Sequence, residues 1–226
     1  MKAIILASGK GTRMAPLTDT RPKPMLKIHG KNLLEWKLER LPESIDQIII
    51  VVNYLREQII EHFGNSWNGI PIEYTVQDPI DGTGGAVALC EKYITDKALI
   101  ISGDDIYEKK DFEELIKYDY AILVSDLGEE GLKRYGQVVE NNGIFIGINE
   151  GILQTGIPSS LINAGAYVIS KEYFTYPKVK WSEDEYGLPQ TLAQIKDDYP
   201  IHVIHATRWI NITTPNDLEK AEKLLA

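Results

Sequence analysis

Short segments rich in isoleucine, valine and leucine recur along the first half of the chain, and segments with a different apolar spacing separate them. Continuous apolar runs of this length are typical of strands that are covered on both faces. These expected strands cover 1–6, 47–52, 72–76, 98–102 and 120–124. Apolar positions three and four residues apart predict helices between them. The expected helices cover 33–41, with Asn32 as its cap, 55–63 and 84–93.

Strands that alternate with helices predict an α/β protein with a Rossmann-like, doubly wound and mostly parallel sheet. The pattern changes after residue 124. Apolar segments on either side of Asn141-Asn142-Gly143 predict a hairpin, and further strands are expected at 166–169 and 201–204. We therefore expect one domain over 1–226, with a nucleotide-binding half at about 1–125 and a β-rich half at about 126–226.

Two helices are expected in the second half. One lies near 186–196, and the other begins at Thr214, with Pro215 in the first helical position and Asp217 in the third. A threonine cap followed by proline and then by an acidic residue is a strong helix start.

Composition narrows the class of protein. The chain has 226 residues, 43% of them hydrophobic and 25% charged, which is ordinary for a globular protein. Cys90 is the single cysteine, so an internal disulfide is impossible, and a reducing cytoplasm is the expected location. We find no signal peptide and no apolar run of ~20 residues, so we expect no membrane span. A net charge of −9 argues against nonspecific binding of nucleic acid.

The first 31 residues have the opposite charge. They contain seven Lys or Arg and one acidic residue, a net +6, while the chain total of −9 leaves −15 for the rest. Within them, Ala7-Ser8-Gly9-Lys10-Gly11-Thr12-Arg13-Met14 follows the first strand, and Arg21-Pro22-Lys23-Pro24-Met25 comes next. Glycines let backbone N–H groups approach a ligand, and successive N–H groups form a concave anion site. The segment therefore predicts a loop that holds a polyphosphate.

Two familiar phosphate loops do not match this segment. The P-loop of nucleoside triphosphatases requires Lys after its second glycine, where this chain has Thr12. The dinucleotide fingerprint requires Gly or Ala where Met14 stands, which disfavours a dehydrogenase.

Polar residues also follow two other expected strands. Gly103-Asp104-Asp105 places carboxylates at a strand end, which suits Mg²⁺, although an ordinary Gly-Asp turn has the same sequence. Gln77 opens a loop that contains Gly82 and Thr83, and an amide side chain can pair with a nucleobase edge. Because ligands of doubly wound sheets lie beyond the carboxyl ends of the strands, the loops at 8–14, 77–83 and 103–106 should converge.

The segment 6–14, together with Pro22-Lys23-Pro24-Met25, resembles the signature of the sugar-1-phosphate nucleotidyltransferases, also called NDP-sugar pyrophosphorylases. The motif spacing is most similar to that of the uridylyltransferase part of the UDP-N-acetylglucosamine-forming enzymes. The resemblance implies that a nucleoside triphosphate, UTP or dTTP favoured, reacts with a sugar 1-phosphate in a Mg²⁺-dependent reaction. The implied partners are these two substrates, with a homo-oligomer left open.

The resemblance also implies roles for individual residues. Arg13, Lys23 and Asp104 would be catalytic. Asp104 and Asn211 would bind Mg²⁺, while Asp105 would be structural. The implied nucleotide-binding residues are Leu6, Ala7, Ser8, Gly9, Lys10, Gly11, Thr12, Arg13, Gln77, Gly82 and Thr83. The implied sugar-phosphate-binding residues are Lys23, Gly136 (after Tyr135), Glu150 and Asn163.

The chain departs from the family pattern at two positions. Asn211 stands where many members have a metal-binding aspartate, and Gly151 follows Glu150 where the family usually has lysine. Two alternatives therefore stay open: a cytidylyltransferase for a small phosphorylated alcohol or amine such as phosphocholine, and a noncatalytic nucleotide-binding protein.

Overall fold

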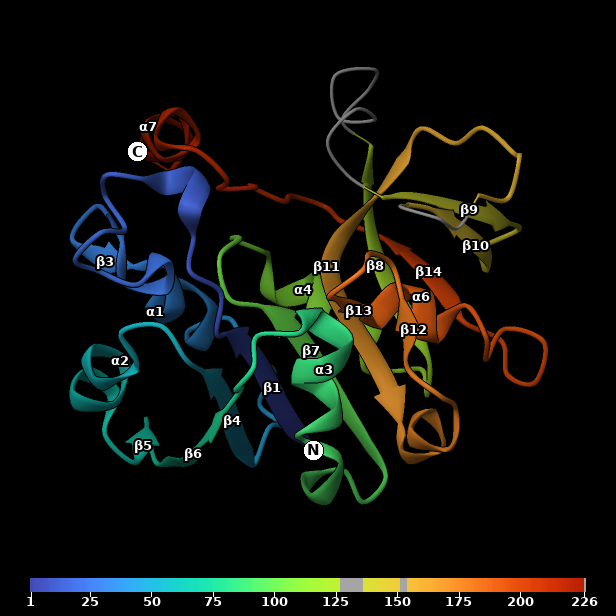
Figure 1. Cartoon of the computed structure of the whole chain (residues 1–226), viewed down its shortest axis with the longest axis horizontal. Helices are drawn as coiled ribbons and strands as arrows, with labels where there is room; N and C mark the ends of the chain where they lie inside the picture. The colour runs from blue at the N-terminus through green and yellow to red at the C-terminus, as the bar shows by residue number, and fades with distance from the viewer. Residues whose placement is uncertain (127–135, 151–153, 226) are drawn as a thin grey trace.

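The computed structural model describes residues 1–126, 136–150 and 154–225. Its centre is a ten-stranded sheet with the strand order β5-β6-β4-β1-β7-β11-β8-β14-β10-β9 (Figure 1). These strands are β1 Lys2–Ala7, β4 Gln47–Val52, β5 Ser66–Trp67, β6 Ile70–Val76, β7 Lys97–Ser102, β8 Ala121–Asp126, β9 Gln137–Asn141, β10 Ile144–Asn149, β11 Leu161–Ser170 and β14 His202–His205. Two small hairpins pair β2 Lys27–Ile28 with β3 Lys31–Asn32, and β12 Val179–Lys180 with β13 Tyr186–Gly187.

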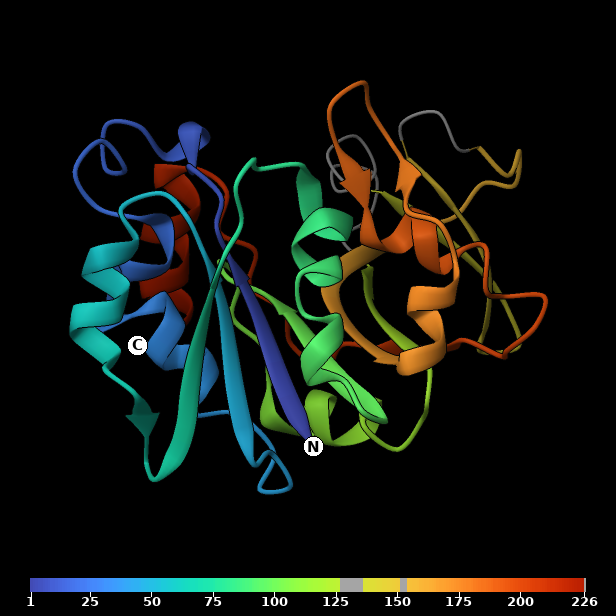
Figure 2. The same ribbon diagram turned by 60° about the horizontal axis from the view of Figure 1, so that its bottom comes forward.

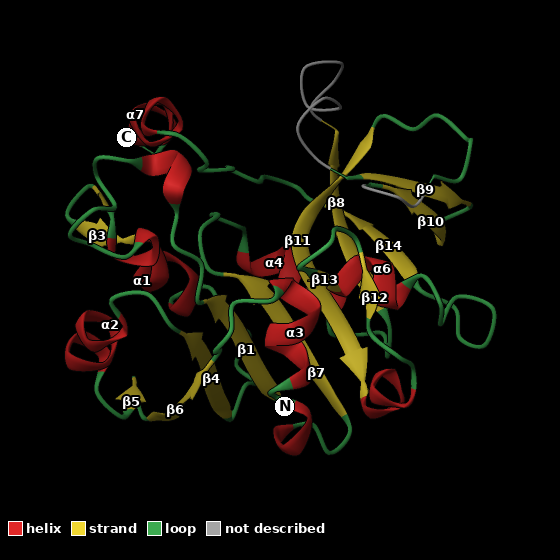
Figure 3. Cartoon of the chain, in the orientation of Figure 1, coloured by secondary structure: helices red, strands yellow, loops and turns green. Residues whose placement is uncertain are grey.

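Helices and 3-10 turns surround the sheet (Figure 3). The α-helices are α1 Leu33–Leu38, α2 Arg56–Phe63, α3 Gly82–Ala88, α4 Lys109–Leu115, α6 Leu188–Leu192 and α7 Pro215–Leu224. The 3-10 helices are η1 Thr12–Met14, η2 Lys23–Met25, η3 Glu91–Tyr93 and η4 Lys171–Thr175.

The doubly wound arrangement follows from strands that are apolar on both faces. On β1, Ala3 and Ile5 pack into one core, which also contains residues of α1, α2 and α4. Ile4 packs into a second core on the other face, which contains residues of α3 and α6. Strands β6, β4, β1 and β7 are parallel, whereas β11 joins β7 in antiparallel orientation. The expected α/β class is confirmed. The four parallel strands β6, β4, β1 and β7 lie in the first half, and a further parallel pair joins β8 to β14 of the second half.

Three expected helices differ from the structure. The helix expected at 33–41 is α1, which ends at Leu38. The helix expected near 186–196 is α6, which covers only Leu188–Leu192. Tyr186 and Gly187 are extended instead, because they pair with β12, and the Tyr186 N–H is donated to the carbonyl of Asp81 over 2.8 Å. The helix expected at 84–93 is divided into α3 and the 3-10 turn η3.

The C-terminal segment returns to the first half of the molecule (Figures 1 and 2). After β14 the chain crosses to α7, where Ala221 shares a third core with Met14, Ile28 and Ile212. The expected start of α7 is confirmed, since Asp217 accepts the Thr214 backbone N–H over 2.8 Å in a capping box. In the described part of the chain, none of the helices combines the length and the hydrophobicity needed to cross a bilayer.

Candidate active site

A pocket of about 890 Å³ lies beyond the carboxyl ends of β1 and β7. The three loops at 8–14, 77–83 and 103–106 converge on it, as expected. The predicted site residues in its wall are Leu6, Ala7, Ser8, Gly9, Gly11, Thr12, Arg13, Lys23, Gln77, Gly82, Thr83, Asp104, Gly136, Glu150, Asn163 and Asn211. Lys10 is an exposed residue of the same loop and does not belong to this described wall.

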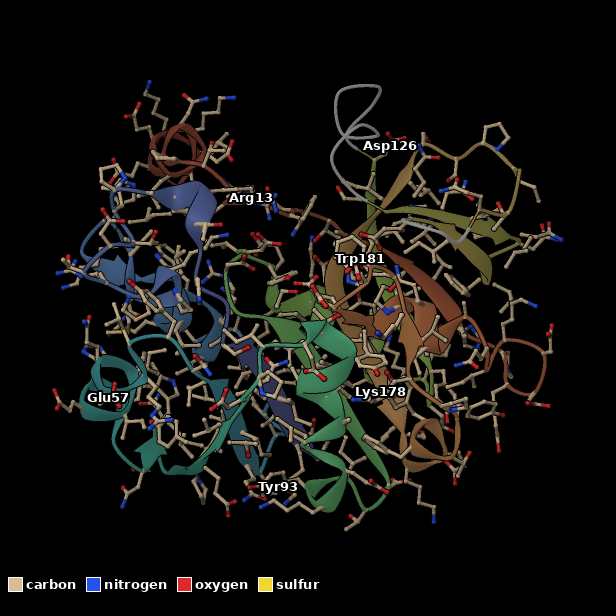
Figure 4. The ribbon with its side chains drawn as sticks, viewed as in Figure 1. Arg13, Glu57, Tyr93, Asp126, Lys178 and Trp181 are labelled. Atoms are coloured by element: carbon tan, nitrogen blue, oxygen red, sulfur yellow. The ribbon has the colours of Figure 1, made fainter. Side chains whose placement is uncertain are left out.

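The glycine-rich loop has a fixed conformation. Gly11 is left-handed, with φ +64°, and its carbonyl accepts the Thr18 hydroxyl over 2.9 Å. Any other residue at position 11 would be strained in this left-handed conformation. Its Cβ would also lie only 3.0 Å from the Lys23 Cβ. Met14 anchors the far end of the loop in the third core. Arg13, between these two anchors, is exposed at the mouth of the pocket (Figure 4).

Lys23 and Asp104 form an ion pair in the middle of the pocket. The Lys23 Nζ lies 2.5 Å from Asp104 Oδ2, and the exposed fractions of the two side chains are 8% and 38%. Burial by the surrounding protein would raise the pKa of Asp104, but the ammonium groups of Lys23 and Lys37, together with hydrogen bonds, outweigh burial and hold the pKa of this carboxyl below its usual value. The pair brings two residues 81 positions apart in sequence, both predicted to be catalytic, into direct contact.

Asp105 points away from this pair and binds the C-terminal segment. Its Oδ1 accepts hydrogen bonds from the Asn211 side chain over 2.9 Å and from the Ile212 N–H over 3.1 Å, and its Oδ2 accepts from Trp209 Nε1 over 3.1 Å. Burial raises the pKa of Asp105, and the adjacent carboxylate of Asp104 raises it further. Asp105 thus has a structural role, since it brings Asn211 to the same strand end as Asp104.

The oxygens at this strand end suit a hard divalent cation. Asp104 supplies a carboxylate and Asn211 an amide oxygen, Oδ1, which also accepts the Thr213 hydroxyl over 2.6 Å. Among the described residues, no group of three or more His, Cys, Asp or Glu side chains is arranged to hold a metal. Two protein oxygens fit Mg²⁺ better than a metal that requires a full protein cage, because Mg²⁺ keeps waters and takes phosphate oxygens from substrates.

The loop after β6 uses its polar side chains to hold itself together. Gln77 is 1% exposed, and its amide nitrogen is donated to Asp81 Oδ1 and to the Gly82 carbonyl, both over 2.9 Å. Its amide oxygen accepts the hydroxyl of Ser8. The Thr83 hydroxyl accepts the Leu188 N–H over 3.0 Å. The sequence suggests that the Gln77 amide pairs directly with a nucleobase. For that, Gln77 would have to exchange its bonds to Ser8, Asp81 and Gly82 for bonds to the base.

The opposite side of the pocket presents Glu150 and Asn163. Asn163 lies at a bulge in β11, where the pairing with β8 shifts register before Tyr167. Its side chain is oriented by two bonds, one to the Tyr167 hydroxyl over 2.6 Å and one from the Gly165 N–H over 3.0 Å. The Asn163 N–H is donated to the Gly136 carbonyl over 2.9 Å, which places Gly136 beside it. Tyr135 and Gly151 lie outside the described residues.

Gln190 is a site residue that sequence reasoning missed. It is 1% exposed, and its amide nitrogen lies 2.8 Å from Glu150 Oε2. Burial raises the pKa of Glu150, and the hydrogen bond from Gln190 offsets part of that effect. Trp181 and Glu185, from the β12–β13 hairpin, also line the pocket, and Trp181 lies across from Arg13 (Figure 4). No local motif marks any of these residues, because the sheet brings them to the pocket from distant parts of the sequence.

A Rossmann-like sheet, a glycine-rich cationic loop and a carboxylate at the neighbouring strand end define a nucleotide-binding transferase fold. The chain matches the nucleotidyl transferase family over residues 2–226 and belongs to it. The resemblance noted in the sequence is therefore confirmed.

Named relatives fall within this class. The chain is 37% identical to the bifunctional protein GlmU of Methanocaldococcus jannaschii, over 100% of the chain and 54% of that protein. It is 29% identical to the UTP–glucose-1-phosphate uridylyltransferase AglF of Haloferax volcanii, covering 100% of the chain and 96% of that protein. The chain spans about half the length of the GlmU relatives that it matches.

Solved structures share the fold. The structure of a UDP-glucose pyrophosphorylase in complex with UDP-glucose superposes with a TM-score of 0.84 and 21% identity, covering 99% of this chain and 97% of that one.

Proposed function

We propose that the protein joins a nucleoside triphosphate, with UTP or dTTP favoured, to a sugar 1-phosphate and releases pyrophosphate in a Mg²⁺-dependent reaction. The observation that carries this proposal is the Lys23–Asp104 pair, which lies in one pocket between the glycine-rich loop and the polar side chains of Glu150 and Asn163. This arrangement has a cationic end for phosphates and a hydrogen-bonding end for a hydroxylated acceptor.

The reaction needs no protein nucleophile. A phosphate oxygen of the sugar 1-phosphate attacks the α-phosphorus, and pyrophosphate leaves from the opposite side. Arg13 and the N–H groups of Gly9–Thr12 hold the β- and γ-phosphates. Lys23 moves from Asp104 to the α-phosphate and the incoming phosphate, where it neutralises the negative charge that develops. Catalysis then rests on positioning and on charge stabilisation.

Asp104 and Asn211 would hold the cation through oxygen atoms. Bound Mg²⁺ neutralises phosphate charge in such sites. Asp105 keeps Asn211 at this position through the 2.9 Å bond described above.

The choice of nucleotide is supported by the relatives. One relative that matches almost end to end is named for UTP and glucose 1-phosphate, and a structural neighbour was solved with UDP-glucose. On the acceptor side, Glu150, Asn163 and the Gly136 backbone offer hydrogen bonds suited to ring hydroxyls.

The test is pyrophosphate release across UTP, dTTP, CTP, GTP and ATP, each with a panel of sugar 1-phosphates. We expect release with uridine or thymidine nucleotides and at least one sugar 1-phosphate, and loss of release when EDTA removes Mg²⁺. If no sugar 1-phosphate supports pyrophosphate release but phosphocholine does, the protein is instead a cytidylyltransferase-type enzyme. Nucleotide binding without release from any acceptor would make it a noncatalytic binding protein.

A further inference from the structure

One stretch of the pocket wall has no role in the reaction described above. The glycine-rich loop and Lys23 account for the phosphate end, and Glu150 with Asn163 accounts for the acceptor end. The wall also includes Leu6–Ser8, at and just after the end of β1, and residues of the loop from Gln77 to Thr83. If the proposed function holds, this stretch faces the nucleobase, so its donors and acceptors decide which base is bound.

Hydrogen-bond partners fix the orientation of the Gln77 amide. One nitrogen hydrogen is donated to Asp81 Oδ1 and the other to the Gly82 carbonyl, each over 2.9 Å. Both partners accept only, because Asp81 is a carboxylate whose other oxygen lies 3.4 Å from the Lys178 ammonium. Gly85 leaves room for this carboxylate, since a Cβ there would collide with it. The amide oxygen of Gln77 must therefore face Ser8.

This orientation determines what Ser8 can do. A hydroxyl has one hydrogen and two lone pairs. The Ser8 hydrogen is donated to Gln77 Oε1, across 69 residues of sequence, in a buried contact. Ser8 is 6% exposed, and it lies in the pocket wall. Toward a ligand, its oxygen is therefore an acceptor and not a donor.

We propose that Ser8 selects the nucleobase. Its oxygen accepts a hydrogen bond from a base that carries a ring N–H on its Watson–Crick edge, which is uracil, thymine or guanine. Cytosine and adenine present a bare ring nitrogen at that place, so two acceptors would face each other without a hydrogen between them. Gln77 is a positioning residue in this scheme, because it acts through Ser8 by holding the hydroxyl hydrogen away from the base.

The experiment compares the binding of five nucleotides with two serine variants. Titration of the full chain with UTP, dTTP, GTP, CTP and ATP is carried out on wild type, Ser8→Ala and Ser66→Ala. Ser66 is an exposed serine of β5 and serves as the matched control. The affinities give each protein's preference among the five nucleotides, and the same preference is then measured as the ratio of kcat/KM values for pyrophosphate release. Equal thermal unfolding midpoints show that the variants are folded.

Wild type is expected to prefer UTP, dTTP or GTP to CTP and ATP. Ser8→Ala is expected to reduce the UTP-to-CTP ratio by about tenfold, the effect of one hydrogen bond, and Ser66→Ala is expected to leave it unchanged. Ser8→Thr keeps the hydroxyl and should keep the preference.

An equal loss of affinity for all five nucleotides in Ser8→Ala would overturn the inference, since it would reveal a purely structural role. If the wild-type protein itself binds CTP or ATP more tightly than UTP, dTTP and GTP, that result alone would overturn the inference. If wild type binds the nucleotides but releases no pyrophosphate with any acceptor, the proposed function fails, and the binding ratios still decide the role of Ser8. If no nucleotide binds, both fail.

Discussion

The phosphate side and the acceptor side of the pocket are assembled in different ways. On the phosphate side, one continuous segment, 6–25, supplies the loop, Arg13 and Lys23, and the loop after the neighbouring parallel strand, β7, supplies Asp104. On the acceptor side, Gly136, Glu150, Asn163 and Gln190 come from four separate segments of the second half. A contiguous segment leaves a recognisable motif, whereas an assembly of distant residues depends on the fold being correct.

The two sides also differ in electrostatics. On the phosphate side, the Lys23 ammonium is paired with the Asp104 carboxylate, and this ion pair must open before Lys23 can bind a phosphate group. The acceptor side holds Glu150 and Asn163 in hydrogen bonds to neighbouring side chains. We therefore expect changes on the phosphate side to affect turnover, and changes on the acceptor side to affect acceptor affinity.

The largest effect is expected on the phosphate side. Arg13→Ala or Lys23→Ala should lower kcat by roughly a hundredfold or more, because one cation that stabilises developing charge is commonly worth about 3–4 kcal/mol. Steady-state pyrophosphate release measures the loss, with Lys117→Ala, an exposed lysine that is paired with Glu114, as control. Full activity in either variant would remove that residue from the mechanism.

A smaller effect is expected on the acceptor side. Gln190→Ala removes the hydrogen bond to the buried Glu150 carboxyl, so KM for the sugar 1-phosphate should rise about tenfold while KM for the nucleotide stays constant. Gln194→Ala is the matched control, since its amide bonds to the carbonyl of Pro177 on the surface. An equal rise in both KM values would show that the two sides are not separable.

The smallest effect concerns the helix that closes the phosphate side. Asp217→Ala should reduce the free energy of unfolding by about 1 kcal/mol at pH 7, because the capping box of α7 is lost. Although partial burial opposes ionisation, hydrogen bonds from Thr214 and Thr213, with the charge of Lys220, outweigh it and lower the pKa of Asp217 below the ordinary value of 3.8. The ionised carboxylate therefore adds stability that is present above about pH 4 and is lost as the pH falls through the lowered value.

Urea denaturation at pH 7 and at acid pH checks this prediction. The difference between wild type and Asp217→Ala should shrink as the solution is acidified, while the exposed Asp197→Ala control should match wild type at both pH values. A difference that grows at acid pH would contradict the assigned direction of the pKa shift.

Several features could be predicted from the sequence because their determinants are local. The expected caps at Asn32 and Thr214 are confirmed, the second with its expected partner Asp217, and the structure adds Glu35 as the capping-box partner of Asn32. The convergence of the three loops follows from the rule for parallel strands.

Other features depend on contacts between distant residues and could not be predicted. The bond between Ser8 and Gln77 joins residues 69 positions apart, and it holds the Gln77 amide in a buried contact at the pocket wall. Gln190 lies in a helix that is only five residues long, because strand pairing of Tyr186 and Gly187 shortens it. Its contact with Glu150 spans 40 residues.

The central claim is that one pocket joins a nucleotide to a sugar phosphate. The most direct measurement incubates the protein with UTP or dTTP, Mg²⁺ and the best acceptor of the sugar 1-phosphate panel, and quantifies both products by mass spectrometry. We predict equal molar amounts of pyrophosphate and nucleoside-diphosphate sugar, and neither product with EDTA. Formation of nucleoside diphosphate and inorganic phosphate, with no nucleoside-diphosphate sugar, would contradict the account.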